Sequence, residues 1–402
     1  MAEIQRIVIA GGSLAGLRAA QALREEGFDG KLTIVSDEAV LPYDRPPLSK
    51  QVLMGSWEPA QAALEDEGTL ADVAEWRLGT KAVGLDLERQ TLQLSDGERL
   101  PFDRALIATG ASPLNLPGTP PLAGIHTLRT MDDCLTIRAA FESGARVAVI
   151  GAGFIGCEVA AAARAHNLDV SLLEALDAPL ERAIGFDAGM AAARLHTGRG
   201  VDVRCGVRVN GFEGTDRVEA VRLGDGTLVP ADVVIVGVGV RPNTGWLEGS
   251  GLALGNGVVC DQFCRTSHPA VYAAGDVARW YNPRFETEMR VEHWTNAVEQ
   301  GMAAAHNMLA AESRQEAFAP VPYVWSDQYD LSIRFAGYTQ DADEAQVVRG
   351  SFDAGEFLVL YRRGARLGGV LAFGMGKLMT QHQRLIARDA TWEEALAFRP
   401  KE

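Results

Sequence analysis

Short apolar runs that end in glycine-rich turns form the dominant pattern along the chain. The clearest case begins with the run 147–150, which leads into the turn 151–156, Gly-Ala-Gly-Phe-Ile-Gly. An alanine-rich stretch follows, and a second apolar run at 170–173 is closed by Glu174. This order predicts strand, glycine turn, helix, strand and acid, which is the pattern of a dinucleotide-binding unit.

Each residue of this motif has a physical reason for its type. Gly151 permits the tight turn, Gly153 lets the backbone approach a pyrophosphate, and Gly156 lets helix and strand pack closely. A carboxylate at Glu174 can accept hydrogen bonds from ribose hydroxyls and repels a 2′-phosphate. An unrelated α/β turn can share the three glycines, but the acid at Glu174 favours an NAD(H) site.

The first 37 residues repeat the pattern less perfectly. The strand-like run 6–10 precedes Gly11-Gly-Ser13-Leu-Ala-Gly16, a helical stretch and a second apolar run follow, and Asp37 is the acid. Ser13 stands where the second glycine usually lies, so close backbone approach is less free there. We interpret this copy as a second dinucleotide site.

Further along the chain the two copies match again, with corresponding residues 129 positions apart. Asp96-Gly97 corresponds to Asp225-Gly226, and Gly110 corresponds to Gly239. Each Asp-Gly pair predicts a hairpin turn that leads into an apolar closing strand. Self-similarity of this extent is much harder to obtain by chance than one motif, and it predicts two Rossmann-like domains.

From about residue 320 the pattern changes to alternating strand-like runs followed by a helix near 378–387, which predicts a small third domain of α+β type. We therefore expect an α/β protein with two Rossmann-like dinucleotide-binding domains, for FAD and NAD, and a C-terminal α+β domain. The expected division is 1–115 and 242–319 for the FAD-binding domain, 116–241 for the NAD-binding domain and 320–402 for the third.

Composition narrows the function. The 402 residues carry a net charge of −15, which argues against a nucleic-acid partner. Five scattered cysteines without a CxxC indicate free thiols in a reducing compartment, and the dispersed histidines show no metal-ligand spacing. No stretch approaches the roughly 20 apolar residues of a membrane helix. We expect a cytoplasmic protein without a metal site or a membrane anchor.

Two nucleotide domains in one chain suggest a flavoprotein that takes hydride from a nicotinamide. Three segments carry a more specific resemblance: the stiff loop 41–50 (Leu-Pro-Tyr-Asp-Arg-Pro-Pro-Leu-Ser-Lys), 292–297 (Glu-His-Trp-Thr-Asn-Ala) and 325–329 (Trp-Ser-Asp-Gln-Tyr). Together with Ala108-Thr-Gly110 and Gly275-Asp276 they resemble the FAD-dependent NADH:ferredoxin reductase family of oxygenase systems. The resemblance covers nearly the whole chain and implies a glutathione-reductase-like fold.

The resemblance assigns cofactor contacts residue by residue. Those implied for FAD are Ala15, Asp37, Arg45, Lys50, Val83, Arg129, Asp276 and Trp294, to which the glycine turns add Gly11, Ser13, Gly16, Thr109, Gly110 and Gly275. Those expected for NAD(H) are Gly151, Gly153, Ile155, Gly156, Glu174, Arg182 and Gly237. Val83 could equally be a plain strand residue, and Arg129 and Arg182 surface charges.

The resemblance also implies two catalytic residues, Lys50 and Glu158. In related flavin reductases a lysine beside flavin N5 pairs with a glutamate at this place in the helix. A cation there stabilises the negative charge of reduced flavin, and the glutamate holds the lysine charged and in position. Alternatively, Glu158 is a plain acid in the first helical turn, where the helix dipole favours it.

The implied function is electron transfer from NADH through FAD to a [2Fe–2S] ferredoxin that supplies a cytochrome P450 or a ring-hydroxylating dioxygenase. Residues 1–133 contain no cysteine, so a thiol relay after the first motif is excluded. Two alternatives stay open: a cysteine-free NADH oxidase that reduces oxygen, and an NADH-sensing flavoprotein of the apoptosis-inducing-factor type.

Such ferredoxins are usually acidic, and residues 320–402 are nearly neutral, with 10 basic and 11 acidic side chains. We therefore expect the ferredoxin to dock near the C-terminal domain. Arg362, Arg363 and Arg366, which cluster in a predicted hairpin turn, are the candidate contacts, although a solvated turn explains them equally well.

Overall fold

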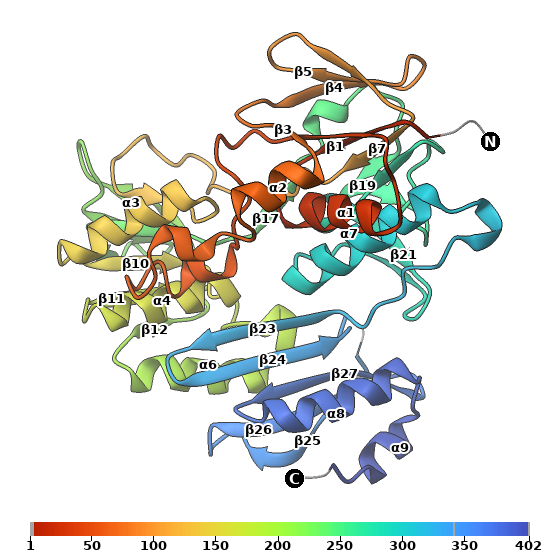
Figure 1. The fold of residues 1–402 in the computed structure, drawn as a ribbon. Coiled ribbons are helices and arrows are strands. Elements are labelled where there is room, and N and C mark those ends of the chain that lie inside the picture. Colours follow the sequence, from red (N-terminus) through yellow and green to blue (C-terminus); the bar gives the residue numbers. More distant parts are fainter. Residues whose placement is uncertain (1–3, 341, 401–402) are drawn as a thin grey trace. The chain divides into compact units, whose positions relative to one another are not determined.

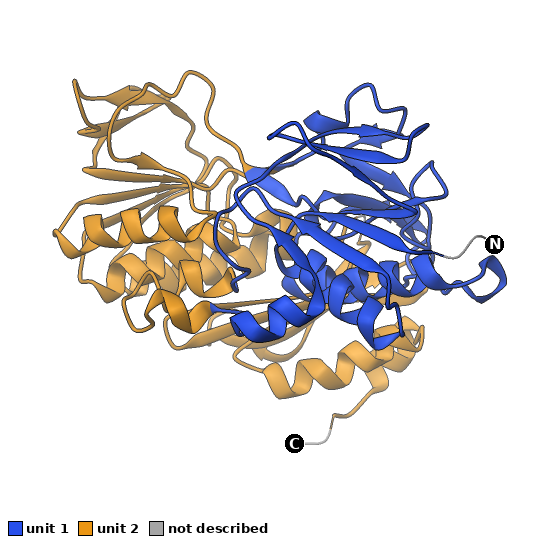
Figure 2. Ribbon diagram, turned by 45° about the horizontal axis from the view of Figure 1, so that its top comes forward, with its two compact units in different colours: residues 1–44, 63–112, 241–322 blue, residues 45–62, 113–240, 323–402 orange. Residues whose placement is uncertain are grey.

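The computed structural model describes residues 4–340 and 342–400 (Figure 1). The chain forms two compact units (Figure 2): residues 1–44, 63–112 and 241–322 make unit 1, and residues 45–62, 113–240 and 323–402 make unit 2. The predicted α/β class with two nucleotide-binding folds and a C-terminal α+β part is confirmed. The boundaries proposed for three separate domains stay a prediction.

A five-stranded parallel sheet forms the centre of unit 1, and its strand order is β20-β7-β1-β2-β3. The strands are β1 (Arg6–Ala10), β2 (Lys31–Val35), β3 (Glu75–Arg77), β7 (Arg104–Ile107) and β20 (Val271–Ala273). Helix α1 (Leu14–Glu25) packs closely on α7 (Trp294–Leu309), since a Cβ added to Gly301 would lie 2.5 Å from the Ala15 carbonyl oxygen. The short helix α2 (Glu67–Val73) precedes β3.

Unit 1 also contains two smaller sheets of three and four strands. The first is antiparallel and contains β4 (Ala82–Asp86), β5 (Thr91–Leu94) and β6 (Arg99–Pro101), and the second contains β18 (Leu254–Gly255), β19 (Gly257–Cys260), β21 (Ala278–Asn282) and β22 (Thr287–Met289). The predicted Asp96-Gly97 turn joins β5 to β6, and Gly97 adopts a φ of +91°, a value that favours glycine.

Unit 2 repeats the parallel arrangement with the strand order β12-β11-β10-β16-β9. Its strands are β9 (Ile125–His126), β10 (Val147–Ile150), β11 (Val170–Leu173), β12 (Asp202–Arg204) and β16 (Val233–Val236), and its helices are α3 (Met131–Glu142), α4 (Phe154–Ala165), α5 (Glu181–Ile184) and α6 (Phe186–Gly198). The antiparallel strands β13 (Val209–Glu213), β14 (Ala220–Leu223) and β15 (Leu228–Pro230) close a core of Val, Ile, Leu and Ala side chains against β10 and β16.

The internal repeat is visible in the backbone. Ala10 of β1 lies opposite Val35 of β2, and Ile150 of β10 lies opposite Leu173 of β11 in the same parallel register. The first glycine of each turn donates its N–H to the carbonyl oxygen of the last residue of the neighbouring strand. Gly11 donates to Val35 and Gly151 donates to Leu173, over 2.8 Å in both copies. The prediction of two related nucleotide-binding units is therefore confirmed at the level of register.

The C-terminal part of unit 2 is an antiparallel sheet of order β23-β24-β27-β26-β25, followed by two helices. The strands are β23 (Tyr323–Gln328), β24 (Leu331–Gly337), β25 (Glu344–Ser351), β26 (Glu356–Arg363) and β27 (Arg366–Phe373), and the helices are α8 (Gly376–Ala387) and α9 (Trp392–Ala397). These elements agree with the strand-like runs and the helix expected from the sequence.

The chain passes from unit 1 to unit 2 at β8 (Ala111–Pro113) and returns at β17 (Val240–Pro242). Short 3₁₀ turns complete the list of elements: η1 (Pro46–Ser49), η2 (Pro59–Ala62), η3 (Gly245–Leu247), η4 (Gly275–Val277) and η5 (Glu312–Arg314). Among the helices of residues 4–340 and 342–400, none is long and apolar enough to cross a membrane.

Candidate active site

The predicted catalytic pair forms a buried ion pair within unit 2. The Lys50 Nζ lies 2.7 Å from Glu158 Oε2, and the two side chains are 9% and 3% exposed. Lys50 directly follows η1, whose prolines fix the backbone, and Glu158 occupies the second turn of α4. The structure therefore brings together two residues that lie 108 positions apart in the sequence.

Two hydroxyl groups complete the surroundings of the Glu158 carboxylate. Ser49 Oγ donates to Oε2, and Ser326 Oγ of β23 donates to Oε1 over 2.7 Å. A buried charge is tolerated when it is paired and its remaining lone pairs are satisfied, as they are here. The alternative interpretation of Glu158 as a plain acid of the first helical turn does not fit, because the residue lies in the second turn of α4 and its side chain is buried among three donors.

The turn that precedes α4 has the shape that a pyrophosphate requires. Gly151 has a φ of +95°, and a Cβ added to Gly156 would lie 2.0 Å from the Gly151 carbonyl oxygen, so neither position accepts a side chain without distortion. A Cβ added to Gly153 would instead meet no atom of the described residues within 4 Å. Gly153 is also the N-cap, and no described side chain caps α4. The free N–H groups and the open space suit a bound phosphate.

Glu174 is oriented by this same turn. Its Oε2 accepts from the Ala152 N–H over 2.6 Å, and its Oε1 accepts from the Leu176 N–H over 2.9 Å. Since each carboxylate oxygen can accept more than one hydrogen bond, the group can still receive ribose hydroxyls. The half-buried carboxylate is thus fixed beside the glycine turn, as expected for an NAD(H) site.

Replacing Glu174 by alanine is expected to raise the KM for NADH about tenfold, because hydrogen bonds to a charged group are lost. The same change is expected to lower the KM for NADPH, because the negative charge that repels a 2′-phosphate is removed. Steady-state rates with both coenzymes and ferricyanide as acceptor measure the two effects. An unchanged preference for NADH in Glu174→Ala would contradict the assignment.

The corresponding turn in unit 1 is equally close-packed. A Cβ added to Gly11 would lie 2.1 Å from the Ala108 carbonyl oxygen, and one added to Gly16 would lie 2.0 Å from that of Gly11. Ser13 is the N-cap of α1, and no cap hydrogen bond from its side chain is found among the described residues. Its hydroxyl can therefore donate to a phosphate oxygen. Ala15 follows in the first turn of the helix.

A second feature of unit 1 fits a bound flavin. The buried atoms His293 Nδ1, Asn296 Oδ1 and Gln300 Nε2, at the start of α7, have no hydrogen-bond partner among the residues that the structure describes. Gln300 Oε1 accepts from the N–H of Gly275, which has a φ of +78°. Buried polar atoms need partners, and the polar groups of FAD can supply them. Sequence reasoning named the segment 292–297 but missed Gln300.

The acid of the first copy occupies a different position from Glu174. Because Val35 is the counterpart of Leu173 in register, the residue that matches Glu174 is Ser36, and Asp37 lies one position further along. Ser36 packs close to Gly12, whose added Cβ would lie 2.7 Å from the Ser36 Cβ. Asp37 is exposed, so its carboxylate is accessible to a ribose.

The remaining predicted cofactor residues divide between the units. Thr109, Gly110, Val83, Gly275, Asp276 and Trp294 belong to unit 1, whereas Arg45, Arg129, Ile155, Arg182 and Gly237 belong to unit 2. Arg45 Nη1 donates to the Arg129 carbonyl oxygen over 2.5 Å, which brings these two together. Val83, Ile155 and Arg182 are exposed. The cofactor contacts of these residues stay a prediction.

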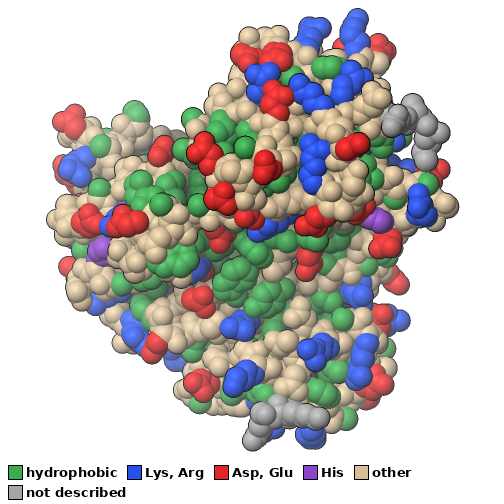
Figure 3. All heavy atoms as spheres, viewed as in Figure 1, with side chains coloured by type: hydrophobic (Ala, Val, Ile, Leu, Met, Phe, Trp, Pro, Cys, Tyr) green, Lys and Arg blue, Asp and Glu red, His purple; other side chains and the backbone are tan. Residues whose placement is uncertain are grey.

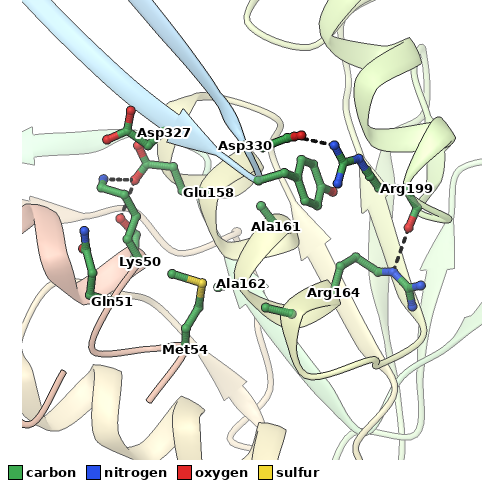
Figure 4. A pocket seen from close by; sticks show the side chains of 13 residues that line it. Lys50, Gln51, Met54, Glu158, Ala161, Ala162, Arg164, Arg199, Asp327 and Asp330 are labelled. Carbon is green, nitrogen blue, oxygen red and sulfur yellow. Dashed lines mark hydrogen bonds and ion pairs between the residues drawn. The ribbon is translucent and has the colours of Figure 1, made fainter. Parts of the chain in front are cut away.

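A cavity of about 520 Å³ adjoins the ion pair within unit 2. Lys50 and Glu158 lie at one side, and Arg164, Arg199 and Asp330 lie at the other side (Figure 4). Met54, Ala161 and Ala162 line the space between them. Arg199 pairs with Asp330, and Arg164 donates to the Arg199 carbonyl oxygen over 3.0 Å. Most of the charged side chains that line the cavity therefore already have a partner.

The cysteines offer no thiol chemistry at this site. The five form no disulfide within the described ranges, and four of them are buried. Burial raises the pKa of Cys134 to about 12, and it raises the pKa of Cys157, beside Glu158, further still. A thiol that stays protonated is a poor nucleophile, so these two buried cysteines are poorly suited to a thiol relay.

Two nucleotide-binding motifs and a buried lysine–glutamate pair define an oxidoreductase of the flavin and nicotinamide class. Comparison with known proteins agrees. A family model described as pyridine nucleotide-disulphide oxidoreductase matches residues 5–301, and one described as reductase C-terminal matches residues 323–401.

The similar proteins of known name are also reductases. The chain is 37% identical to putidaredoxin reductase from Pseudomonas putida over 90% of this chain and 86% of that one. It is also 37% identical to the ferredoxin–NAD(+) reductase component of the anthranilate 1,2-dioxygenase system of Burkholderia cepacia, over 95% and 94%.

Among solved structures, the covalent putidaredoxin reductase–putidaredoxin complex matches with a TM-score of 0.91 at 34% identity, covering 96% of this chain and 93% of that chain. The ferredoxin reductase for the CYP199A2 system from Rhodopseudomonas palustris matches with a TM-score of 0.92 at 32% identity, covering 98% of both chains. The chain belongs to the pyridine nucleotide-disulphide oxidoreductase family, and within it to the ferredoxin–NAD(+) reductases of oxygenase systems. It is an oxidoreductase that uses FAD and NAD(H).

Proposed function

We propose that this protein transfers electrons from NADH through FAD to a [2Fe–2S] ferredoxin, which in turn supplies a cytochrome P450 or a ring-hydroxylating dioxygenase. The buried Lys50–Glu158 pair beside the NAD(H) motif carries the proposal. The names of the relatives support it, since they are reductases of both kinds of oxygenase system.

Bound FAD supplies the conversion between a two-electron hydride donor and a one-electron acceptor. The residues of this protein bind the two cofactors and orient them for the reaction. In the proposed arrangement, Gly151, Gly153, Gly156 and Glu174 hold NADH, and Lys50 is the cation that stabilises reduced flavin. Glu158 keeps the Lys50 ammonium in place through the 2.7 Å contact. Free cysteines and the use of NADH support a cytoplasmic location.

The experiment that tests this function compares cytochrome c reduction by NADH with and without an added [2Fe–2S] ferredoxin. A ferredoxin reductase reduces cytochrome c slowly alone and much faster when ferredoxin carries the electrons. A rate that ferredoxin leaves unchanged, together with rapid oxygen consumption, would instead identify an NADH oxidase.

The docking site proposed for ferredoxin is the hairpin between β26 and β27. Figure 3 shows basic side chains distributed over the C-terminal domain, with acidic ones among them. Arg362 Nε lies 3.4 Å from Glu344, Arg366 lies 3.7 Å from Asp389, and Arg363 lies over the Tyr338 ring at 5.5 Å. The two ion pairs are partly exposed, so an acidic partner can compete for Arg362 and Arg366.

Charge reversal of the three arginines to glutamate is expected to raise the KM for ferredoxin about tenfold, because complementary charge steers association. The rate of ferricyanide reduction by NADH is expected to stay unchanged. Arg89→Glu, which breaks an exposed ion pair with Asp86 in unit 1, is the matched control. A parallel fall of both activities would contradict docking at this hairpin.

A further inference from the structure

A buried chain of hydrogen bonds extends behind Glu158, away from Lys50. Ser326 Oγ lies 2.7 Å from Glu158 Oε1, and Gln328 Nε2 lies 3.1 Å from Ser326 Oγ. Gln328 Oε1 lies 3.0 Å from His196 Nε2, and His196 Nδ1 lies 2.9 Å from the Tyr329 hydroxyl. All five residues belong to unit 2, and the chain connects four polar side chains to the catalytic carboxylate.

The fold explains why these side chains meet. Ser326 and Gln328 are two positions apart on β23, so both point to the same face of the sheet. His196 reaches them from α6, and α6 and the β23–β24 hairpin lie side by side within unit 2 (Figure 1). Ser326, Gln328 and His196 are each 0% exposed. Burying three polar side chains together is costly unless each finds its partner.

The hydrogen bonds of this series all run in one direction, from donor to acceptor toward Glu158. A carboxylate can only accept, so the Ser326 hydroxyl donates to Glu158 and its oxygen accepts from the Gln328 amide. The Gln328 carbonyl oxygen then accepts from His196, which requires the hydrogen on Nε2. His196 Nδ1 is left to accept from the Tyr329 hydroxyl. Every donor therefore points toward Glu158, which requires a neutral His196.

The environment of His196 favours that neutral form. Burial lowers the pKa of His196 to about 4, because the charged ring would lose its hydration. Burial also raises the pKa of Tyr329, so its hydroxyl keeps the proton that it donates. Hydrogen bonds that run in one direction polarise each other, which strengthens the last link, from Ser326 to Glu158.

Tyr329, at the far end of this series of hydrogen bonds, is held in place as well. Tyr329 adopts a φ of +58°, an unusual value for a residue other than glycine. Its ring meets the His196 ring edge-on with centroids 5.3 Å apart, and the Arg199 guanidinium lies 5.2 Å from the ring centroid. Arg199 is held in turn by its ion pair with Asp330 (Figure 4). These contacts over-determine the position of the Tyr329 hydroxyl.

We propose that Gln328, His196 and Tyr329 are positioning residues for the reaction: through Ser326 they hold the Glu158 carboxylate, and through it the Lys50 ammonium, in the orientation that electron transfer requires. The proposal rests on the proposed function, since it gives Lys50 a role at the flavin. It adds a structural dependence of the catalytic pair on the C-terminal strand β23 and on helix α6.

The test uses the FAD-loaded full-length protein with three substitutions. Gln328→Leu removes the central link, Tyr329→Phe removes one hydroxyl at the outer end, and Lys50→Met is the reference. Tyr272→Phe is the matched control, because its buried hydroxyl donates to the Asn307 carbonyl oxygen in unit 1. Tyr329→Phe keeps the experiment informative if Gln328→Leu folds poorly.

Two measurements are made on each protein. Stopped-flow reduction of the flavin by NADH is expected to slow about fivefold in Gln328→Leu and less in Tyr329→Phe, with the Kd for NADH unchanged. Nitrogen-15 NMR is expected to show His196 in the wild-type protein with a proton on Nε2 alone, exchanging slowly. In Gln328→Leu that proton is expected to exchange quickly. Tyr272→Phe is expected to match the wild type in both.

The outcomes separate the two proposals. If Lys50→Met leaves flavin reduction unchanged, the role of Lys50 in the proposed function fails, while the NMR result still decides whether the directed chain exists. If Lys50→Met slows reduction but Gln328→Leu and Tyr329→Phe do not, the positioning role is wrong. A His196 ring that carries its proton on Nδ1 would also overturn the proposal.

Discussion

Lys50→Met is expected to slow the reduction of bound flavin by NADH by about two orders of magnitude, while FAD stays bound. The reason is electrostatic: a cation placed where negative charge develops stabilises the transition state, and loss of one such group typically costs about 10²–10³ in rate. Lys50 is suited to this task because its Nζ is held 2.7 Å from Glu158 in a buried site. Stopped-flow absorbance of the flavin measures the effect.

The same substitution is expected to destabilise the protein, because it leaves the Glu158 carboxylate buried without its cation. Breaking a buried pair typically costs about 3–5 kcal/mol. The double variant Lys50→Met/Glu158→Gln is expected to recover most of that stability without recovering the rate. Lys31→Met, which breaks an exposed lysine–glutamate pair of 3.0 Å, is the control. Unchanged reduction kinetics in Lys50→Met would show that the lysine does not act on the flavin.

Gly156→Ala is expected to destabilise the protein by about 3 kcal/mol or more. The added Cβ would lie 2.0 Å from the Gly151 carbonyl oxygen and 3.3 Å from the Val149 side chain, so α4 must shift away from β10. The shift would displace Glu158 and the phosphate turn together, because both lie on α4 or directly before it. Chemical denaturation measures the stability, and NADH titration measures the binding.

Gly153→Ala is the control for that experiment. Its added Cβ meets no atom of the described part of the chain within 4 Å, so the fold is expected to keep nearly its full stability. Its effect is expected on the ligand instead, as a higher KM for NADH, because the methyl group fills the space that the pyrophosphate needs. Equal stability of the two variants would contradict the close packing of helix and strand at Gly156.

Much of the fold follows from local patterns in the sequence. Glycines with a fixed spacing after a short apolar strand predicted both nucleotide turns, and the Asp-Gly pairs predicted the hairpins between β5 and β6 and between β14 and β15. The repeated order of strand, glycine turn, helix and strand predicted two related units, and their strand pairs β1–β2 and β10–β11 share the same parallel register. These features depend on residues that lie close together in the sequence, and they can therefore be predicted from it.

The site was harder to predict because its contacts are distant in sequence. Pairing of Lys50 with Glu158 followed from a resemblance, since no local pattern joins positions 108 apart. Ser326 and Gln328 lie in the segment 325–329 that carried the resemblance, but their contacts with Glu158 and His196 depend on β23, α4 and α6 packing together. The distinction between Ser36 and Asp37 depends on strand register, which the sequence alone left one residue uncertain.

The central claim is that reduced flavin in this protein gives its electrons to a ferredoxin. The most direct measurement reduces the enzyme with one equivalent of NADH under anaerobic conditions and then mixes it with oxidised [2Fe–2S] ferredoxin, following both chromophores. We predict rapid reoxidation of the flavin with two ferredoxin molecules reduced for each NADH. Flavin that stays reduced in the presence of ferredoxin, but reoxidises rapidly when oxygen is admitted, would contradict the account.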